Sequence, residues 1–424
     1  MEHDSIGALN VPAEAYYGVQ SMRAATNFQI THRPLHPVLI DSIVMVKKAA
    51  AITNEKSGKL DQQIVQAIIQ ACDEILDGNL RDQFIVDAIQ GGAGTSANMN
   101  ANEVIANRAI EILGGTKGDY SIVHPNDHVN MSQSTNDVIP TAGKITVLKL
   151  LPQTIKELEK LEKAMEEKEA EFDDILKMGR TQLQDAVPMR LGQSFGAFAH
   201  VLKRDIKRLK NVMDEMKVLN IGATAIGTAI NVDPYYLANI SYELSKVAGI
   251  SLKQADDLID ATQNLDGFVS VSGVLKTCAV DISKISNDLR LMSFGPRTGL
   301  SEINLPARQN GSSIMPGKIN SVIPEVVSQV AYLIIGHDYT ITMAAEAGQC
   351  EEYIEKSVGI STALCPYIGY AKSAEIAKKS LKTGISVKEL VLEEGLLKEE
   401  ELKEILKPEK MTQPMREKVM KAVS

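Results

Sequence analysis

The chain has 424 residues and a formal net charge of −9, with 44% hydrophobic and 23% charged residues. This balance excludes a disordered chain, and the net negative charge argues against a nucleic-acid binder, because phosphate binding needs clustered Lys and Arg. No apolar stretch reaches the ~20 residues of a membrane helix and residues 1–10 lack signal-peptide features, so we expect a cytoplasmic protein that does not bind membranes.

Helical segments and polar loops alternate up to about residue 134. Apolar periodicity predicts helices over Val38–Glu55 and Asp61–Asp77, and a third is expected over Val104–Leu113. The loops between them are long enough to carry function. We therefore expect an N-terminal, mostly helical domain with site loops over residues 1–134.

Long helical segments dominate from about Asp137 onwards. A heptad seam recurs at spacings of three and four residues through Phe268, Val271, Leu275, Cys278, Ile282, Ile285, Leu289 and Met292. The segments Leu191–Met216 and Leu151–Met178 show a similar period. Such segments form rods about 50 Å long that pack side by side. A central long-helix bundle is expected over residues 135–349.

The segment Val322–Ala347 is apolar on nearly every face. A helix of this kind must be surrounded by other helices, in its own subunit or in neighbouring ones, so we expect a homo-oligomer. Short amphipathic helices follow, and residues 350–424 are expected to form a small C-terminal helical domain. The predicted fold class is mainly α.

Four polar loops at the borders of helical segments are candidate sites: Gln90–Glu103, Asn126–Asp137, Gly179–Pro188 and Gly311–Asn320. Free N–H groups at helix starts, with Ser and Thr hydroxyls, bind anions well. Gly311–Lys318 fails as a phosphate loop, because five residues rather than four separate its glycines. The glycines near residue 92 lack the strand of a dinucleotide fingerprint.

These loops suit a small dicarboxylate as the substrate. Ser312 and Ser313 could supply a base and a hydrogen-bond donor, Lys318 a positive charge and Asn320 a directional donor. The four cysteines are scattered, with no CxxC pair or histidine at metal-ligand spacing, so no metal ligands are predicted.

The loop GSSIMPGKIN at 311–320 resembles the signature loop of the aspartase/fumarase superfamily, lyases that eliminate ammonia or water to form fumarate. Five further segments resemble the family in the expected order, at residues 12–20, 91–103, 126–137, 179–188 and 286–306. Gln182 follows Arg180 and Thr181, where fumarases generally carry His and some aspartases carry Gln, so the resemblance is to the aspartases. It implies a three-domain fold and elimination of ammonia from L-aspartate; a fumarase, or an inactive paralogue or scaffold, is the alternative.

The resemblance also implies roles for individual residues. Ser312 would be the base that takes the C3 proton, and Thr95, Ser134, Thr135 and Ser313 would stabilise the resulting aci-carboxylate. Lys318, Asn320 and Thr181 would hold the other carboxylate, with Asn136 and Gln182 near the ammonium group. His124 and His128 could stabilise their own loop, whereas the resemblance places them at the border of a secondary anion site. No organic cofactor is implied, and activation by a divalent metal is left open.

The chain departs from the family after EAGQ at 346–349, where Gln349 runs directly into CEEYIEKSVGI at 350–360. About forty residues are expected to be missing there, equivalent to one bundle helix of ~60 Å and its turn. In the family this helix lies in the bundle that joins subunits into a tetramer, with each active site composed from three chains.

Overall fold

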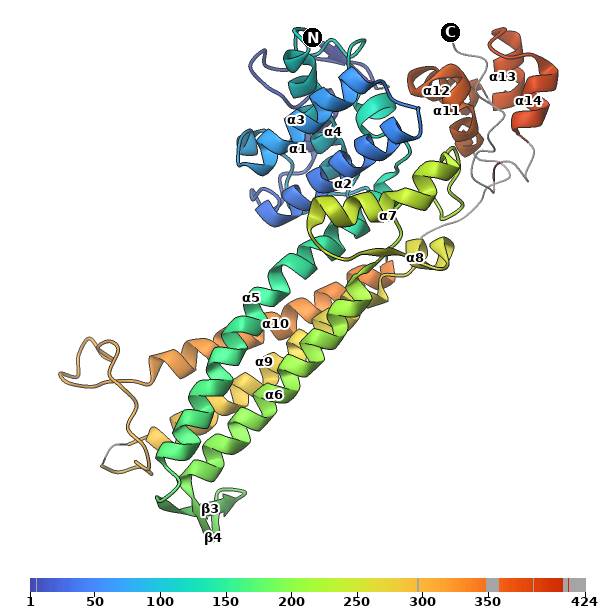
Figure 1. Cartoon of the computed structure of the whole chain (residues 1–424). Coiled ribbons are helices and arrows are strands. Elements are labelled where there is room, and N and C mark those ends of the chain that lie inside the picture. The colour runs from blue at the N-terminus through green and yellow to red at the C-terminus, as the bar shows by residue number, and fades with distance from the viewer. Residues whose placement is uncertain (5, 296, 348–357, 384, 407–410, 412–424) are drawn as a thin grey trace. The chain divides into compact units, whose positions relative to one another are not determined.

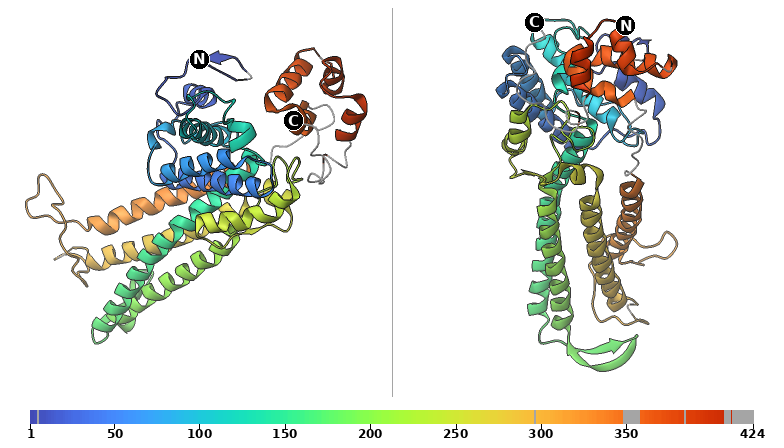
Figure 2. Two further views of the ribbon diagram at one scale, coloured as in Figure 1. Left: turned by 45° about the horizontal axis from the view of Figure 1, so that its top comes forward. Right: turned by 90° about the vertical axis from the view of Figure 1, so that its right-hand side faces the viewer.

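The computed structural model describes residues 1–4, 6–295, 297–347, 358–383, 385–406 and 411, and helices dominate it, as predicted (Figures 1 and 2). The chain divides into two compact units. The first comprises Met1–Thr146, Lys217–Asn264 and Gly348–Ser424, and the second Val147–Met216 and Leu265–Ala347. The three-domain division stays a prediction. The junction at residues 349–350, where a family helix is expected to be absent, lies outside the described residues.

The first unit is built from α1 (Val19–Asn27), α2 (Pro37–Lys56), α3 (Gln62–Leu76), α4 (Thr95–Ile112), the start of α5 (Thr135–Glu171), α7 (Pro234–Ala248) and α8 (Leu258–Gln263). Helix α2 contacts α3, α4 and α7. The predicted helices over 38–55 and 61–77 are confirmed as α2 and α3. Asp61 caps α3 by accepting a hydrogen bond from Gln63 N.

Short elements complete this unit. Strands β1 (Glu2–His3) and β2 (Ala8–Leu9) pair antiparallel, whereas β5 (Val218–Leu219) and β6 (Lys253–Gln254) pair parallel. A single 3₁₀ turn spans Arg81–Gln83, and a π-helical turn spans Pro125–Val129.

The C-terminal segment contains a 3₁₀ turn (Val358–Leu364), α11 (Cys365–Ile368), α12 (Tyr370–Thr383), α13 (Val387–Glu393) and α14 (Glu399–Ile405). These helices enclose their own apolar core, in which Leu364, Ile376, Leu390 and Leu402 are fully buried. The start of α13 is fixed by a capping box between Ser386 and Glu389.

The second unit is built from the rest of α5, α6 (Leu191–Met216), α9 (Asp266–Ser293), α10 (Val322–Ala347) and the hairpin β3 (Leu176–Thr181) and β4 (Gln184–Arg190). Helix α9 contacts both α6 and α10, and Figure 1 shows α9 and α10 side by side. The heptad seam of α9 is confirmed at alternate positions, with Val271, Cys278, Ile285 and Met292 buried.

Two predicted helix boundaries are wrong. The helical period through Leu151–Met178 was expected to continue to Met178, but α5 ends at Glu171 and the chain then enters β3. The helix predicted over Val104–Leu113 was expected to begin at Val104, but the corresponding α4 begins at Thr95. It starts earlier because Gly94, with φ 87°, turns the backbone into the helix ahead of a polar Asn-rich turn.

Helix α10 keeps much of its apolar surface exposed in the single chain. Its buried residues are Ser328, Ala331 and Asp338, whereas Val330 is 51% and Leu333 58% exposed. Asp338 accepts hydrogen bonds from Ser272 Oγ at 2.8 Å and Lys276 Nζ at 2.6 Å, which ties α10 to α9. The face away from α9 is the apolar surface that the sequence predicted to be covered by other helices.

Candidate active site

Thr95 is the first residue of α4 and follows a tight glycine turn. Gly92, Ala93 and Gly94 all have positive φ, and a Cβ on Gly94 would lie 2.9 Å from Ile139 on α5. The missing side chain therefore lets the start of α4 pack directly against the first turns of α5. Thr95 itself is exposed at the N-terminal end of the helix, where the helix dipole favours an anion.

Ser134, Thr135 and Asn136 form the start of α5. Ser134 Oγ accepts a hydrogen bond from Asn136 N at 3.3 Å, and Asp137 Oδ1 accepts one from Ser134 N at 2.8 Å. Ser134 thus caps the second N–H of α5, and the side chain of Asp137 reaches back to the N–H of Ser134. Asn136 Nδ2 donates to Ala225 O at 2.7 Å, so its amide is held while the residue stays exposed.

Asp137 is a buried carboxylate that the sequence did not single out. It also accepts N–H hydrogen bonds from Gly222 at 3.0 Å and Thr224 at 3.1 Å, and so connects α5 to the loop before α7. Burial raises its pKa to about 6, against the lowering effect of these N–H donors and of Lys47. Asp137 fixes the backbone on which Ser134 and Thr135 sit.

Thr135 is further held from α4. Asn98 Nδ2 lies 3.3 Å from Thr135 Oγ1 and donates to it. The predicted residues Thr95, Ser134, Thr135 and Asn136 therefore gather at two neighbouring helix starts in the first unit. Two converging N-termini with hydroxyl groups can bind a carboxylate.

Thr181 and Gln182 lie at the tip of a hairpin, so the expectation of a plain loop over Gly179–Pro188 is wrong. Thr181 pairs with Gln184, and the two turn residues Gln182 and Leu183 have φ values of 49° and 66°. Two left-handed residues make the turn type that suits the twist of a hairpin. Both Thr181 and Gln182 are exposed.

Glu302 holds this hairpin to the segment that follows α9. Its carboxylate pairs with Arg180 and, at 3.1 Å, with Lys177 Nζ. Arg180 is the residue immediately before Thr181, so the ion pair restrains the tip of the hairpin.

Ser312 accepts two backbone hydrogen bonds within its own loop. Ile314 N lies 3.3 Å and Met315 N 3.1 Å from Ser312 Oγ. Both donors would favour a negatively charged oxygen. The neighbouring Ser313 is exposed and free of this turn's hydrogen bonds.

The Ser312 loop is closed at its base by Gly311 and Asn320. Gly311 N donates to Lys318 O at 2.8 Å, and Asn320 Nδ2 donates to Gly311 O at 3.1 Å. A Cβ on Gly311 would lie 2.7 Å from the side chain of Asn320, so this contact requires glycine. Lys318 is exposed, which leaves its ammonium accessible to an anion.

The predicted residues thus form three groups. Thr95 and 134–136 belong to the first unit, and the hairpin tip and the Ser312 loop belong to the second. Across the described ranges, no hydrogen bond or ion pair joins the hairpin tip at 181–182 to the loop at 311–320.

His124 and His128 stabilise their own turn. Nδ1 of His124 accepts N–H hydrogen bonds from Asn126 and Asp127, and Nδ1 of His128 accepts one from His124 N at 2.9 Å. Burial lowers the pKa of both histidines, against the raising effect of Asp127. The neutral rings act as acceptors, which agrees with the loop-stabilising alternative.

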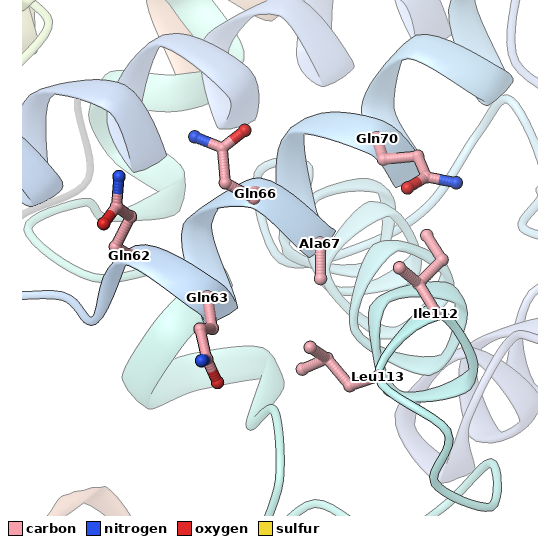
Figure 3. Close-up of a pocket in the computed structure, with 7 residues that line it drawn as sticks. All are labelled: Gln62, Gln63, Gln66, Ala67, Gln70, Ile112 and Leu113. Carbon is pink, nitrogen blue, oxygen red and sulfur yellow. The ribbon is translucent and has the colours of Figure 1, made fainter.

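A shallow hollow between α3 and the end of α4 lies apart from these residues (Figure 3). It is lined by Gln62, Gln63, Gln66, Ala67, Gln70, Ile112 and Leu113. It holds none of the predicted site residues. Over the described part of the chain, no group of three His, Cys, Asp or Glu side chains is arranged to hold a metal ion, and no helix has the length and apolarity to cross a membrane.

Comparison with known proteins decides the family. The Lyase family matches residues 7–336, and the fumarase C C-terminus family matches residues 360–413. An aspartate ammonia-lyase from a Bacillus species is 49% identical, over 98% of this chain and 97% of the relative. The chain belongs to the aspartase/fumarase superfamily.

Solved structures of this superfamily share the fold. The fumarate lyase:delta crystallin from Brucella melitensis, bound to cobalt, superimposes with a TM-score of 0.80 at 46% identity, covering 97% of this chain and 99% of that one. A class II fumarase from Schistosoma mansoni gives a TM-score of 0.78 at 32% identity, covering 97% and 98%.

The match to the Bacillus relative also contains positions that this chain lacks. The match to the Bacillus enzyme runs over 456 positions, so at least 32 of them (456 − 424) have no residue here. A deletion of this order agrees in size with the absence expected after Gln349.

Proposed function

We propose that the chain is an aspartate ammonia-lyase, which reversibly eliminates ammonia from L-aspartate to give fumarate. The observation that carries the proposal is the 49% identity to an aspartate ammonia-lyase over nearly the whole of both chains. Gln182 at the hairpin tip supports it, because fumarases generally carry His at this position.

In the proposed mechanism Ser312 removes the proton from C3 of the substrate. A serine hydroxyl is normally far too weak a base, so its alkoxide must be stabilised. The hydrogen bonds from Ile314 N and Met315 N to Ser312 Oγ support this role, because they strengthen as the oxygen becomes charged. Lys318 in the same loop adds a positive charge.

Loss of the C3 proton leaves a dianionic aci-carboxylate. Thr95, Ser134, Thr135 and Ser313 are proposed to donate hydrogen bonds to it, which accelerates the reaction because these bonds are strongest in the transition state. The position of Thr95, Ser134 and Thr135 at the N-terminal ends of α4 and α5, where the helix dipole favours an anion, supports this assignment.

The other end of the substrate needs a separate set of groups. Lys318, Asn320 and Thr181 are proposed to bind the second carboxylate, and Asn136 and Gln182 to lie near the ammonium group. Ammonia then leaves C2 with its bonding electrons as the C2–C3 double bond forms. No step in this scheme requires an organic cofactor, and metal activation is a matter for assay.

We further propose that the active protein is a homo-oligomer, a tetramer as in the family, in which the three groups of site residues come from different subunits. The exposed apolar face of α10 supports assembly, since monomers seldom expose contiguous patches of this kind. The mass in solution tests this, and Leu333→Lys should lower it.

A cytoplasmic location is part of the proposal. The described cysteines Cys72, Cys278 and Cys365 are free thiols, which is usual in a reducing compartment.

The test is an assay on a sample whose mass has been measured. Fumarate should form from L-aspartate, seen by its ultraviolet absorbance. If the protein converts fumarate to malate faster than it adds ammonia to fumarate, the fumarase alternative is supported. The structural similarity to the Schistosoma mansoni fumarase is the observation that favours this alternative. A monomer or aggregate without either activity would support the inactive paralogue or scaffold.

A further inference from the structure

Lys47 is a fully buried lysine on α2 whose ammonium contacts only side-chain amides at hydrogen-bond distance. Its Nζ atom donates to Asn98 Oδ1 at 2.6 Å, Asn130 Oδ1 at 2.8 Å and Gln133 Oε1 at 2.9 Å. An ammonium has three N–H groups and no acceptor, so all three are used. Burial lowers its pKa to about 7, while the facing Asp137 on α5 and Cys72 on α3 raise it. A charge in this position costs folding free energy.

The ammonium determines which way the amide of Asn98 points. Because protonated Lys47 can only donate, Asn98 must turn its Oδ1 toward Lys47 and its Nδ2 away from it. Nδ2 then donates to Asn130 Oδ1 at 3.1 Å and to Thr135 Oγ1 at 3.3 Å. A flipped amide would place an NH₂ group against the ammonium.

The orientation of Asn98 in turn restricts the direction of the Thr135 hydroxyl proton. Its Oγ1 accepts a hydrogen bond from Asn98, so the hydroxyl proton cannot point back along that line. The proton must point to another acceptor. Thr135 begins α5, where the N-terminal N–H groups favour a bound anion, so a carboxylate there would receive this proton.

We propose that Lys47 is a positioning residue that, through Asn98, turns the hydroxyl of Thr135 so that it donates to the substrate carboxylate. The inference rests on the proposed function for the identity of that carboxylate. The direction of the Thr135 hydroxyl is inferred from the hydrogen-bond geometry alone. The signal in the sequence was a lysine at helical spacing from Ile43, Ala50 and Asn54, all of which are buried.

Asn98→Asp tests this without removing the buried charge. The carboxylate keeps an oxygen toward Lys47, with which it now forms an ion pair, so the variant should fold. Its second oxygen replaces the NH₂ group 3.3 Å from Thr135, so the hydroxyl must turn and donate to it. Lys47→Met is unsuitable as a test, because it leaves three buried amide oxygens without a donor and so destabilises the fold.

The readout is the dissociation constant of the whole protein for fumarate, measured by calorimetry. Asn98→Asp should raise it at least tenfold in the wild-type background and less than twofold in a Thr135→Val background. Asn107→Asp is the matched control, because Asn107 is a buried asparagine of the same helix. Its Nδ2 donates to Tyr16 O and to the hydroxyl of Tyr120, and not to Thr135. Asn107→Asp should leave the affinity unchanged.

Equal losses in the two backgrounds, or no loss in either, would overturn the inference. If the wild-type protein neither binds fumarate nor forms it, the proposed function fails, and a neutron structure then decides the inference separately. A deuterium on Thr135 Oγ1 directed away from Asn98 supports it, and one directed at Asn98 overturns it.

Discussion

The backbone N–H of Met315 lies 3.1 Å from the Oγ atom of Ser312 and donates a hydrogen bond to it. The donor comes from the same loop, three residues along the chain. The loop of the proposed base therefore itself supplies a donor that stabilises negative charge on Ser312 Oγ. A backbone donor of this kind cannot be removed by a side-chain change, so the role of Ser312 can be tested without disturbing it.

Ser312→Ala should abolish turnover and leave folding intact. General bases contribute about 10²–10⁴-fold to rate, and a half-buried loop hydroxyl contributes little to stability. We expect kcat to fall at least about a hundredfold, with the urea midpoint unchanged. Ser121→Ala, an exposed turn serine, should keep full activity. Near-normal turnover by Ser312→Ala would show that another group is the base.

Lys318→Ala should weaken substrate capture more than it slows the chemical step. A hydrogen bond to a charged group contributes about 1.5–3 kcal/mol, so KM should rise at least about tenfold. Stability should not change, because Lys318 is exposed. Steady-state kinetics with L-aspartate measures both constants, and Lys160→Ala on the exposed face of α5 is the control. An unchanged KM would contradict the carboxylate role.

Gly94→Ala should destabilise the first unit more than Gly114→Ala. Both glycines have positive φ, 87° and 82°, so the backbone strain of alanine is nearly equal at the two positions. Only at Gly94 would the new Cβ meet a side chain, at 2.9 Å from Ile139, whereas nothing lies within 4 Å at Gly114. The difference in the free energy of unfolding should be about 1–3 kcal/mol, measured by urea titration. Equal losses would mean that α4 and α5 do not pack as described.

Asp137 should make stability fall as pH rises from about 4 to 6. Burial raises its pKa from 3.8 to about 6, so between these values the folded state binds more protons than the unfolded state. The stabilising contribution is therefore full below about pH 4 and is lost as pH rises through about 6, by up to ~3 kcal/mol.

Asp137→Asn supplies the comparison, because it removes the titrating group and keeps one acceptor oxygen. The difference in unfolding free energy between wild type and variant should change with pH in that window alone. A pH-independent difference would show that the carboxylate titrates normally.

Apolar periodicity predicted several of the long helices, because packing sets that period directly. Helices α6 and α9 lie where spacings of three and four indicated them, and α10 lies where the sequence is apolar on nearly every face. The hairpin could not be predicted in this way, because its turn uses Gln182 and Leu183 rather than the Asn or Gly that usually mark left-handed positions. The alternating Glu and Lys of α5 also gave no end signal near Glu171.

The candidate site was predictable only in part. Hydroxyl and amide residues at helix borders pointed to the loops at 90–103 and 126–137, and the family resemblance then pointed to Thr95 and Thr135 within them. Asp137 and Lys47 were not predicted, because their hydrogen-bond partners Thr224 and Asn98 lie 87 and 51 residues away in the sequence. Long-range hydrogen bonds of this kind leave little local pattern.

The exposed apolar side of α10 should make the stability of the protein depend on its concentration. An isolated copy keeps side chains such as Val330 and Leu333 in water, and the proposed association would bury them. Mass action then couples stability to protein concentration. The melting temperature should therefore rise as the protein concentration increases. A newly synthesised copy in a cell should be more susceptible to proteolysis until it associates with another copy.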